Sequence, residues 1–305
     1  MKENTTGWKF VLMMLLCVVV WALAFPFIRM TLDEGLSPIN LTIMRFFVVC
    51  VVFLIILLLK SNKFSKLHKK DVLPIFALGF SGVMVYHLGL NYGEQYVSPG
   101  AASLIIATIP IYIVFLAFIF LKEKITARQI FGIVLALCGV LIISIWGKED
   151  VFFEIKYLTA LIAILIAAIM GAVYTIAGKK LLERYSALSL TVYAMLFGSL
   201  GLIPFFRLSL FSELADLSLT GWLLIIFLGV FSTVIGYFIW YVALEIKPAS
   251  EIGIYLYLVP VFSTIASYFL LGHAITIFFI FGGAIVIIGL YLVNRKNRKR
   301  VRKFL

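Results

Sequence analysis

The sequence is poor in charged residues: only 13% of its 305 residues are Asp, Glu, Lys or Arg. Acidic residues are the scarcer kind, with 14 Asp and Glu against 26 Lys and Arg, so the net charge is +12. Soluble domains are about 25% charged and roughly 45–50% apolar, whereas 64% of this chain is hydrophobic. This composition excludes an ordinary soluble core and predicts an all-α polytopic membrane protein.

Cysteine is also rare, and the sequence contains no recognisable catalytic or metal-binding motif. Cys17, Cys50 and Cys138 all lie in apolar runs, with no C-x-x-C pair and no Cys/His pair at metal spacing, so we expect them to pack as small apolar residues. The segment ending in Gly178-Lys179-Lys180 lacks the first Gly and the Ser/Thr of a phosphate-binding loop. We therefore expect no metal, no cofactor, no catalytic residues and no enzymatic activity.

The basic residues do not indicate a nucleic-acid partner. They gather between the apolar runs and in the tail at 295–305, where topology rules and anionic lipid favour them. The grooves and stacking loops of nucleic-acid-binding modules are missing. We expect the basic tail to contact anionic lipid and the chain to bind no nucleic acid.

Ten apolar runs are long enough to span a bilayer, which takes about 20 residues per helix. They cover 9–31, 38–60, 72–93, 98–121, 126–146, 156–178, 187–206, 221–244, 249–271 and 275–294. The first run resembles a secretory signal, since Ala22-Leu23-Ala24 could be a cleavage site. It also has a counterpart 150 residues later, which argues against cleavage and favours a spanning helix.

The two halves of the chain repeat each other at a constant shift of 150 residues. Pro110 falls on Pro260, Thr126 on Thr276, Gly132 on Gly282 and Gly139 on Gly289. We therefore predict a first repeat at 1–147, a second at 155–294 and a basic tail at 295–305. Five helices per repeat is an odd number, so the second repeat must enter from the opposite side, as in transporters built from inverted repeats.

The distribution of Lys and Arg predicts the orientation. With a cytoplasmic N-terminus, the inside segments hold 21 of these residues and the outside segments hold four, namely Arg29, Lys148, Lys156 and Arg207. Arg45 lies within the second run. This bias predicts that both termini are cytoplasmic.

Several motifs resemble those of the drug/metabolite transporter superfamily, EamA type. In the first half they are the Trp21 segment, Y-H-L-G-L-N-Y-G at 86–93, S-P-G-A-A-S-L at 98–104 and the run from P-I-Y-I to K-E-K-I-T at 110–126. In the second half they are G-V-F-S-T-V-I-G-Y-F-I-W-Y-V-A-L at 229–244 and L-Y-L-V-P-V-F at 256–262. The resemblance covers 9–294 in both copies.

The resemblance implies a ten-helix transporter whose helices 1, 3, 4, 6, 8 and 9 surround a central cavity. It also implies that small solutes such as amino acids and their derivatives are carried, mostly outward. One position departs from the family pattern: His273 stands where an acidic residue often matches Glu123 of the first copy. A function that needs a symmetric pair of carboxylates is therefore in doubt.

Few ionisable residues lie inside the apolar runs, and such residues are functional candidates by default. His87, Asn91 and Glu94 share one face of the third helix, where they could line the cavity, with His87 as a proton carrier. Alternatively, Glu94 faces water while the other two bond neighbouring helices. Arg45 could bind a substrate carboxylate, pair with Glu94 or extend to the outer interface.

Arg45 and Glu94 are also candidates for gating or coupling, and three further residues join them. Glu251 stands in the first turn of the ninth helix, where the helix dipole favours it, and it could also be a gate or a coupling carboxylate. Pro110 and Pro260 fall mid-helix, and we expect each to kink its helix.

Aromatic residues at helical spacing are candidates for lining the cavity, although such faces also serve helix packing or an interface belt. The expected substrate-binding residues are Trp21, Phe25, Tyr86, His87, Asn91, Ser103, Tyr174, Tyr237, Trp240, Tyr241 and Tyr255.

The sequence thus predicts a secondary transporter of the cell membrane, an exporter of amino acids or related small metabolites that alternates access between two inverted repeats. A lipid flippase is the nearest alternative, and an integral membrane enzyme acting on lipid-linked substrates is a more distant one. The partner expected is a small-molecule substrate. The sequence leaves open whether the chain is a monomer or a homodimer, and whether transport is coupled to protons.

Overall fold

The structure is a computed structural model that describes residues 7–121, 126–146, 155–272 and 275–294. All regular secondary structure in these residues is helical. Glu123, His273 and the basic tail at 295–305 lie outside the described residues.

The helices of the first half are α1 (Gly7–Asp33), α2 (Pro38–Leu59), α3 (Val72–Gly79), η3 (Phe80–Val85), α4 (Tyr86–Glu94), α5 (Pro99–Ile106), α6 (Ile109–Leu121) and α7 (Ala127–Trp146). Those of the second half are α8 (Ile155–Leu181), α9 (Ala187–Leu200), α10 (Ser209–Ala215), α11 (Leu219–Phe227), η5 (Leu228–Ile235), α12 (Gly236–Ile246), α13 (Ala249–Ile252), η6 (Gly253–Tyr257), α14 (Leu258–Leu271) and α15 (Ile277–Asn294). Short 3₁₀ turns, η1 (Ser61–Lys63), η2 (Lys69–Asp71) and η4 (Ile203–Phe205), lie in the connections.

Within the described residues, eight helical stretches are long and apolar enough to cross a membrane. They are Gly7–Asp33, Pro38–Leu59, Lys69–Glu94, Pro99–Phe120, Ile155–Leu181, Ala187–Phe205, Leu219–Ile246 and Ala249–Leu271. The two remaining predicted runs also form helices, α7 and α15, but their apolar parts, Ile130–Gly139 and Ile277–Gly289, are shorter. The multi-pass helical architecture is confirmed, with eight candidate spans in place of the ten predicted.

Serine residues begin several of the spans. The hydroxyls of Ser37, Ser98, Ser186 and Ser218 each accept a hydrogen bond from the backbone N–H three residues later. This bond satisfies one of the four N–H groups that a helix start leaves without a partner. Gly35, with a φ of 97°, follows α1 in the left-handed region that favours glycine, and so permits the turn into α2.

Two spans contain π-helices at matching positions of the two halves. The segment η3 lies between α3 and α4, and η5 lies between α11 and α12. At the 150-residue shift they coincide from Phe80 onward, and the helix after each begins at Tyr86 and Gly236 respectively. Because π-helices are rare and frequently lie at functional sites, we expect the functional site to lie near these two segments.

The predicted kinks at Pro110 and Pro260 are helix breaks instead. A turn at Ala107–Thr108 ends α5, and Pro110 is the second residue of the new helix α6. Likewise η6 precedes α14, in which Pro260 is the third residue. A proline in the first turn removes only an N–H that would lack a helical partner anyway, so both prolines start helices.

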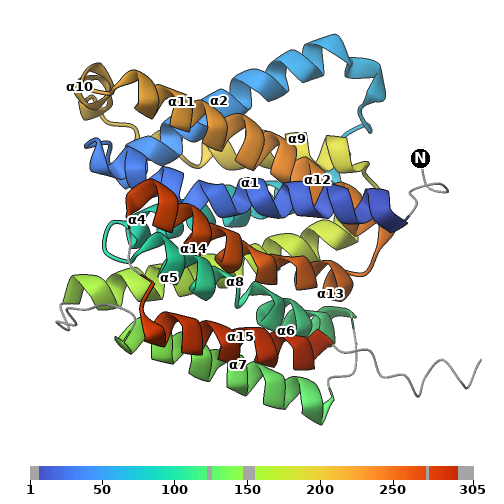
Figure 1. Ribbon diagram of the computed structural model, residues 1–305. Coiled ribbons are helices and arrows are strands. Elements are labelled where there is room, and N and C mark those ends of the chain that lie inside the picture. The colour runs from blue at the N-terminus through green and yellow to red at the C-terminus, as the bar shows by residue number, and fades with distance from the viewer. Residues whose placement is uncertain (1–6, 122–125, 147–154, 273–274, 295–305) are drawn as a thin grey trace, which may run out of the picture.

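Helices α7 and α15 pack side by side at one edge of the molecule (Figure 1). A Cβ atom at Gly139 would lie 2.7 Å from the carbonyl oxygen of Gly282, and one at Gly289 would lie 2.5 Å from that of Gly132. The glycines paired by the repeat are therefore the points of closest backbone approach between the two helices.

The first helices of the two halves run in opposite directions. In Figure 1, α1 begins on the right, beside the N-terminus, whereas α8 begins on the left. The start of α1 and the end of α15 lie on the same side of the bundle. This arrangement agrees with the predicted inverted repeats. Large apolar side chains such as Leu58 and Phe269 point outward, as lipid-facing surfaces require.

Candidate functional site

A cavity lies between the two halves, and the empty space within it and at its open mouth together is about 680 Å³. Its walls are Trp21, Ala24, Phe25, Arg45, Gly82, Tyr86, His87, Leu90, Ile106, Ile109, Gly171, Tyr174, Thr175, Ser232, Tyr237, Trp240, Leu256 and Val259. These residues come from both repeats, so the cavity is shared between them.

The walls of the cavity follow the internal repeat. At the shift of 150, sixteen of the lining residues form eight pairs: Trp21 with Gly171, Ala24 with Tyr174, Phe25 with Thr175, Gly82 with Ser232, His87 with Tyr237, Leu90 with Trp240, Ile106 with Leu256 and Ile109 with Val259. The two halves therefore present equivalent backbone positions to one space. The side chains in most pairs differ greatly in size or polarity, so the cavity itself is asymmetric.

The irregular helical segments supply part of the walls. Gly82 and Ser232 belong to the π-helices η3 and η5. Ile106 and Ile109 flank the break between α5 and α6, and Leu256 and Val259 lie across the matching boundary between η6 and α14. The repeat thus places its non-α segments around the cavity.

Four aromatic rings form one group at the cavity. The ring centroid of Trp21 lies 5.5 Å from that of Tyr237 and 5.2 Å from that of Trp240. Tyr174 meets Tyr237 edge to face at 5.5 Å. Such a group offers broad apolar contact and the negative faces of π systems to a solute.

Hydrogen bonds hold these rings in position. The Nε1 of Trp21 donates to the carbonyl oxygen of Ser232 at 2.9 Å, and the Nε1 of Trp240 donates to the Thr175 hydroxyl at 3.3 Å. A hydrogen bond of 3.2 Å joins the Nε2 of His87 to the Tyr237 hydroxyl. Each of these bonds joins two different helices, so each ring is held in place by a neighbouring element.

Arg45 is the one Lys, Arg, Asp or Glu among the described residues that line the cavity. Its side chain is buried, and its Nε donates to the Thr233 hydroxyl at 2.8 Å while its Nη2 donates to the Ser232 hydroxyl at 3.0 Å. Its Nη1 has no hydrogen-bond partner in the described part of the chain. The expectations that Arg45 extends to the interface or pairs with Glu94 are wrong, because two hydroxyls on η5 hold the guanidinium inside.

Other predicted polar residues lie outside the cavity wall. The Asn91 side chain donates to the Thr42 hydroxyl at 2.9 Å, as expected for a helix-bridging residue. Ser103 donates to the backbone oxygen of Gly100 at 2.7 Å. Glu94 does not face water: it is fully buried, and neither carboxylate oxygen has a hydrogen-bond partner among the described residues.

Two predicted aromatic residues, Tyr241 and Tyr255, do not line the cavity, and of the two Tyr241 packs against a residue of its wall. Tyr241 stacks on Tyr174 with a centroid distance of 5.0 Å and an interplanar angle of 7°. Tyr255 packs against Phe10 at 6.2 Å. Phe25 and Tyr86, by contrast, line the cavity directly, as Trp21, His87, Tyr174, Tyr237 and Trp240 also do.

Of the gating and coupling candidates, Arg45 lines the cavity and the other four do not. Glu251 is in the first turn of α13, as predicted, and is half-buried. Pro110 and Pro260 start helices, as described above, and Glu94 ends α4. Nothing in the described residues resembles a metal site, since no three His, Cys, Asp or Glu side chains cluster together there.

The lining residues that were not predicted are mostly small or aliphatic. They are Ala24, Gly82, Leu90, Ile106, Ile109, Gly171, Thr175, Ser232, Leu256 and Val259. None is a distinctive residue type. The 150-residue repeat could have found six of them. Ala24, Leu90, Gly171 and Thr175 are partners of predicted residues, as listed above, while Ser232 lies in the motif at 229–244 and Gly82 is its partner.

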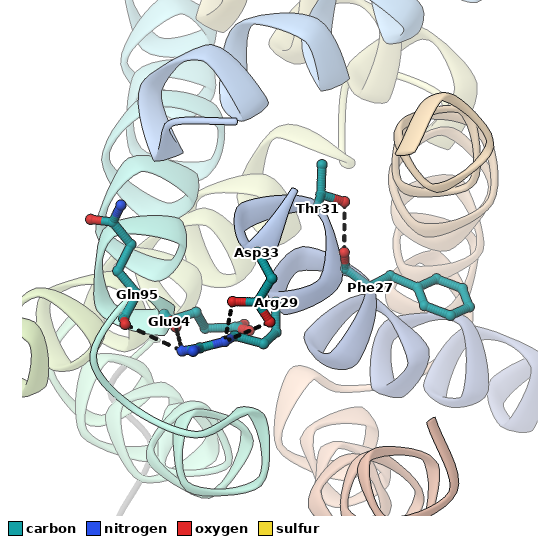
Figure 2. Close-up of polar contacts among 6 residues, drawn as sticks. All are labelled: Phe27, Arg29, Thr31, Asp33, Glu94 and Gln95. Carbon is teal, nitrogen blue, oxygen red and sulfur yellow. Dashed lines mark hydrogen bonds and ion pairs between the residues drawn. The ribbon is translucent and has the colours of Figure 1, made fainter. Parts of the chain in front are cut away.

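Cations cap the last turns of two spans in matching fashion. Arg29, near the end of α1, donates from its Nη1 to the backbone oxygens of Glu94 at 3.1 Å and Gln95 at 3.2 Å (Figure 2). Lys179, its counterpart on α8, donates to the backbone oxygens of Leu244 and Lys247. A cation at a helix C-terminus satisfies free carbonyls and opposes the helix dipole.

Two repeats of membrane-spanning helices that share one partly polar cavity are the arrangement of a membrane transporter. The chain matches the model of the EamA-like transporter family twice, at residues 8–145 and 158–295. It belongs to this family and is a multi-pass transporter of the drug/metabolite transporter type in the cell membrane.

Similar proteins bear transporter names. The chain is 38% identical over 282 residues to an uncharacterized transporter of Archaeoglobus fulgidus, covering 92% of this chain and 97% of that protein. It is 33% identical over 305 residues to a probable terminal-alkyne amino-acid exporter of Streptantibioticus cattleyicolor, covering 99% and 98%. A solved crystal structure has the same fold, with a TM-score of 0.65, 16% identity and coverage of 98% and 99%.

Proposed function

We propose that this chain exports amino acids or related carboxylate-bearing metabolites through the shared cavity. The observation that carries the proposal is Arg45 in the wall of an otherwise largely apolar and aromatic cavity, because its buried Nη1 has no hydrogen-bond partner among the residues that the structure describes. A guanidinium N–H without a partner in such a place favours an anionic oxygen, since charge-assisted hydrogen bonds are about twice as strong as neutral ones. The aromatic group then contacts the apolar body of the solute.

The proposed mechanism is alternating access between two inverted repeats, 1–147 and 155–294. In this proposal α7 and α15 complete ten spans, both termini are cytoplasmic, and the tail at 295–305 contacts anionic lipid. The paired lining positions support it, because equivalent positions of both halves meet at one site. The name of the Streptantibioticus cattleyicolor protein supports amino-acid export. Polar groups within the cavity favour a soluble solute over a lipid.

Efflux from proteoliposomes tests this function. The vesicles are loaded with labelled phenylalanine, with 3-phenylpropionate, which lacks the amino group, or with phenethylamine, which lacks the carboxylate. We expect efflux of the two carboxylates and not of phenethylamine. Arg45→Gln should lower carboxylate efflux by about 10- to 100-fold, which corresponds to losing one hydrogen bond to a charged group, and Arg45→Lys should restore part of it.

Arg207→Gln is the matched control, because it removes one positive charge at an exposed position outside the cavity. It should transport as the wild type does. The proposal fails if neither carboxylate leaves the vesicles, or if Arg45→Gln transports as fast as Arg207→Gln.

A further inference from the structure

We propose that Arg29 and Lys179 are gating residues, each of which holds one end of the cavity closed and releases its contacts when that end opens. The inference rests on the alternating-access mechanism proposed above, because a gate has a role only if the cavity opens to each side in turn. It does not depend on which solute the cavity carries, and it does not involve Arg45.

The contact of Arg29 joins α1 to α4 one helical turn beyond the cavity. The Nη1 of Arg29 donates to the backbone oxygens of Glu94 and Gln95 (Figure 2). Phe25 lies one turn before Arg29 on α1 and lines the cavity. Leu90 lies one turn before Glu94 on α4 and also lines it. We call this contact the Arg29 latch, and it joins the two walls just past the cavity.

The contact of Lys179 joins α8 to the end of α12 in the same way. Its Nζ donates to the backbone oxygen of Leu244 and, at 3.1 Å, to that of Lys247. Thr175 lies one turn before Lys179 and Trp240 one turn before Leu244, and both line the cavity. At the shift of 150, the cation, the first carbonyl and the two lining residues of this Lys179 latch match those of the Arg29 latch.

The two latches lie at opposite ends of the cavity. The helices α1 and α8 run in opposite directions, and each cation lies near the end of its helix (Figure 1). The Nζ of Lys247, whose backbone oxygen belongs to the Lys179 latch, lies 4.4 Å from the ring centroid of Phe10 near the start of α1. The Lys179 latch is therefore on the side of the N-terminus, and the Arg29 latch is on the far side.

Each latch connects two helices that touch little elsewhere. The helix α4 packs most extensively against α8, and α12 packs most extensively against α1. In the first pair, a Cβ atom at Gly89 would lie 2.7 Å from the carbonyl oxygen of Ala163, and in the second, one at Gly236 would lie 2.5 Å from the Nε1 of Trp21. All four helices contribute to the cavity walls, so a tilt of one pair against the other opens one end of the cavity and closes the other.

Each latch stabilises the states in which its own end is closed. A cation at a helix end hydrogen-bonds carbonyls and opposes the helix dipole, and these interactions are lost when the two helices separate. Removing the cation of one latch therefore shifts the population toward the state open at that end. Removing both cations should cancel the two shifts.

Labelling of one cysteine in the cavity of the full chain tests the inference. Leu256→Cys is placed in a chain whose native cysteines are replaced by alanine, and a membrane-impermeant thiol reagent is applied to each side of sealed vesicles of known orientation. The measured quantity is the labelling rate from the far side divided by that from the N-terminal side. Arg29→Gln should raise this ratio by about 3- to 10-fold, and Lys179→Gln should lower it by a similar factor, as expected for hydrogen bonds of partly exposed cations.

Further variants separate the charge of the latch from the stability of the fold. Arg29→Lys and Lys179→Arg keep both cations and should leave the ratio near that of the wild type. The double variant Arg29→Gln, Lys179→Gln should return the ratio toward that value. Arg207→Gln removes a cation at an exposed position outside both latches and should not change the ratio.

The opposite directions of the two shifts decide the outcome. The inference is overturned if Arg29→Gln and Lys179→Gln move the ratio in the same direction or leave it unmoved, as a general loosening of the fold would. Labelling of Leu256→Cys from one side alone in a chain with both latches intact would contradict alternating access, and the gates with it. A failed efflux assay with both shifts present would instead count against the proposed solute.

Discussion

Buried polar side chains in this protein differ in whether all of their polar atoms have partners among the described residues. Asp71 is buried at the start of the third span, where its Oδ1 forms an ion pair of 2.9 Å with the Arg184 Nη1 and its Oδ2 accepts a hydrogen bond of 2.9 Å from the Tyr185 hydroxyl. Burial raises the pKa of Tyr185, so its phenol stays protonated and donates at neutral pH. Asp71 thereby ties the first repeat to the loop between α8 and α9. By contrast, the Nη1 of Arg45 and both carboxylate oxygens of Glu94 have no partner in the part of the chain that the structure describes.

Asp71→Asn should destabilise the protein by about 1–3 kcal/mol, because it removes the charge from a buried carboxylate that holds one ion pair and one hydrogen bond. Thermal unfolding in detergent measures the effect. Asp216→Asn removes a carboxylate from an exposed position and should change stability by less than about 0.5 kcal/mol. Equal melting temperatures for the two variants would contradict the structural role given to Asp71.

The sequence predicts the large lining residues well and the small ones poorly. Trp21, Tyr237 and Trp240 stand out because aromatic residues at helical spacing mark a face. Gly82 and Ser232 carry no such mark, and only their place in the repeat distinguishes them. Sequence patterns also do not predict the hydrogen-bond partners of a buried side chain. Several groups are candidates for Arg45, and the packing of η5 against α2 is what brings the Thr233 and Ser232 hydroxyls to it.

At the scale of the helices, prolines lie where two of the spans break, and glycines lie where α7 and α15 approach most closely. The repeat correctly pairs Pro110 with Pro260, but a proline pattern does not tell a kinked helix from a new one. That choice depends on the backbone before the proline, where a turn or a 3₁₀ segment ends the previous helix. The π-helices are likewise invisible to hydrophobic periodicity, since one extra residue per turn hardly changes an all-apolar run.

Gly139→Ala should weaken the packing of α7 on α15. The added methyl group would press on the Gly282 carbonyl oxygen and on the backbone nitrogen and side chain of Val286. Backbone atoms cannot move aside as a flexible side chain can. We expect a loss of about 1–3 kcal/mol in stability, as for other overpacked contacts.

Gly283→Ala provides the control on the same pair of helices, because a Cβ there meets nothing within 4 Å. Removing a helical glycine at an open position should leave stability unchanged or slightly raised. Melting curves in detergent distinguish the two variants, and a loss at Gly283 equal to that at Gly139 would show that the close approach of α7 and α15 has no such role.

At the scale of the whole molecule, the two halves supply equivalent positions but unequal side chains to one cavity. At the 150-residue shift, Trp21 corresponds to Gly171 and Leu90 corresponds to Trp240. The sequence predicts the repeat and the opposite directions of its halves, because an odd number of spans requires them. It does not predict which helices form continuous spans, since that depends on breaks set by local packing.

The central claim is that the shared cavity opens to each side of the membrane in turn, and a single cysteine in the cavity tests it directly. Leu256→Cys is introduced after Cys17, Cys50 and Cys138 are replaced by alanine, and a membrane-impermeant thiol reagent is applied from each side of sealed vesicles. The account predicts labelling from both sides, slowed by transported carboxylates. Phe269→Cys, on the outward surface, should resist the aqueous reagent from either side. Labelling of Leu256→Cys from one side alone would contradict a carrier that opens its shared cavity to both faces of the membrane.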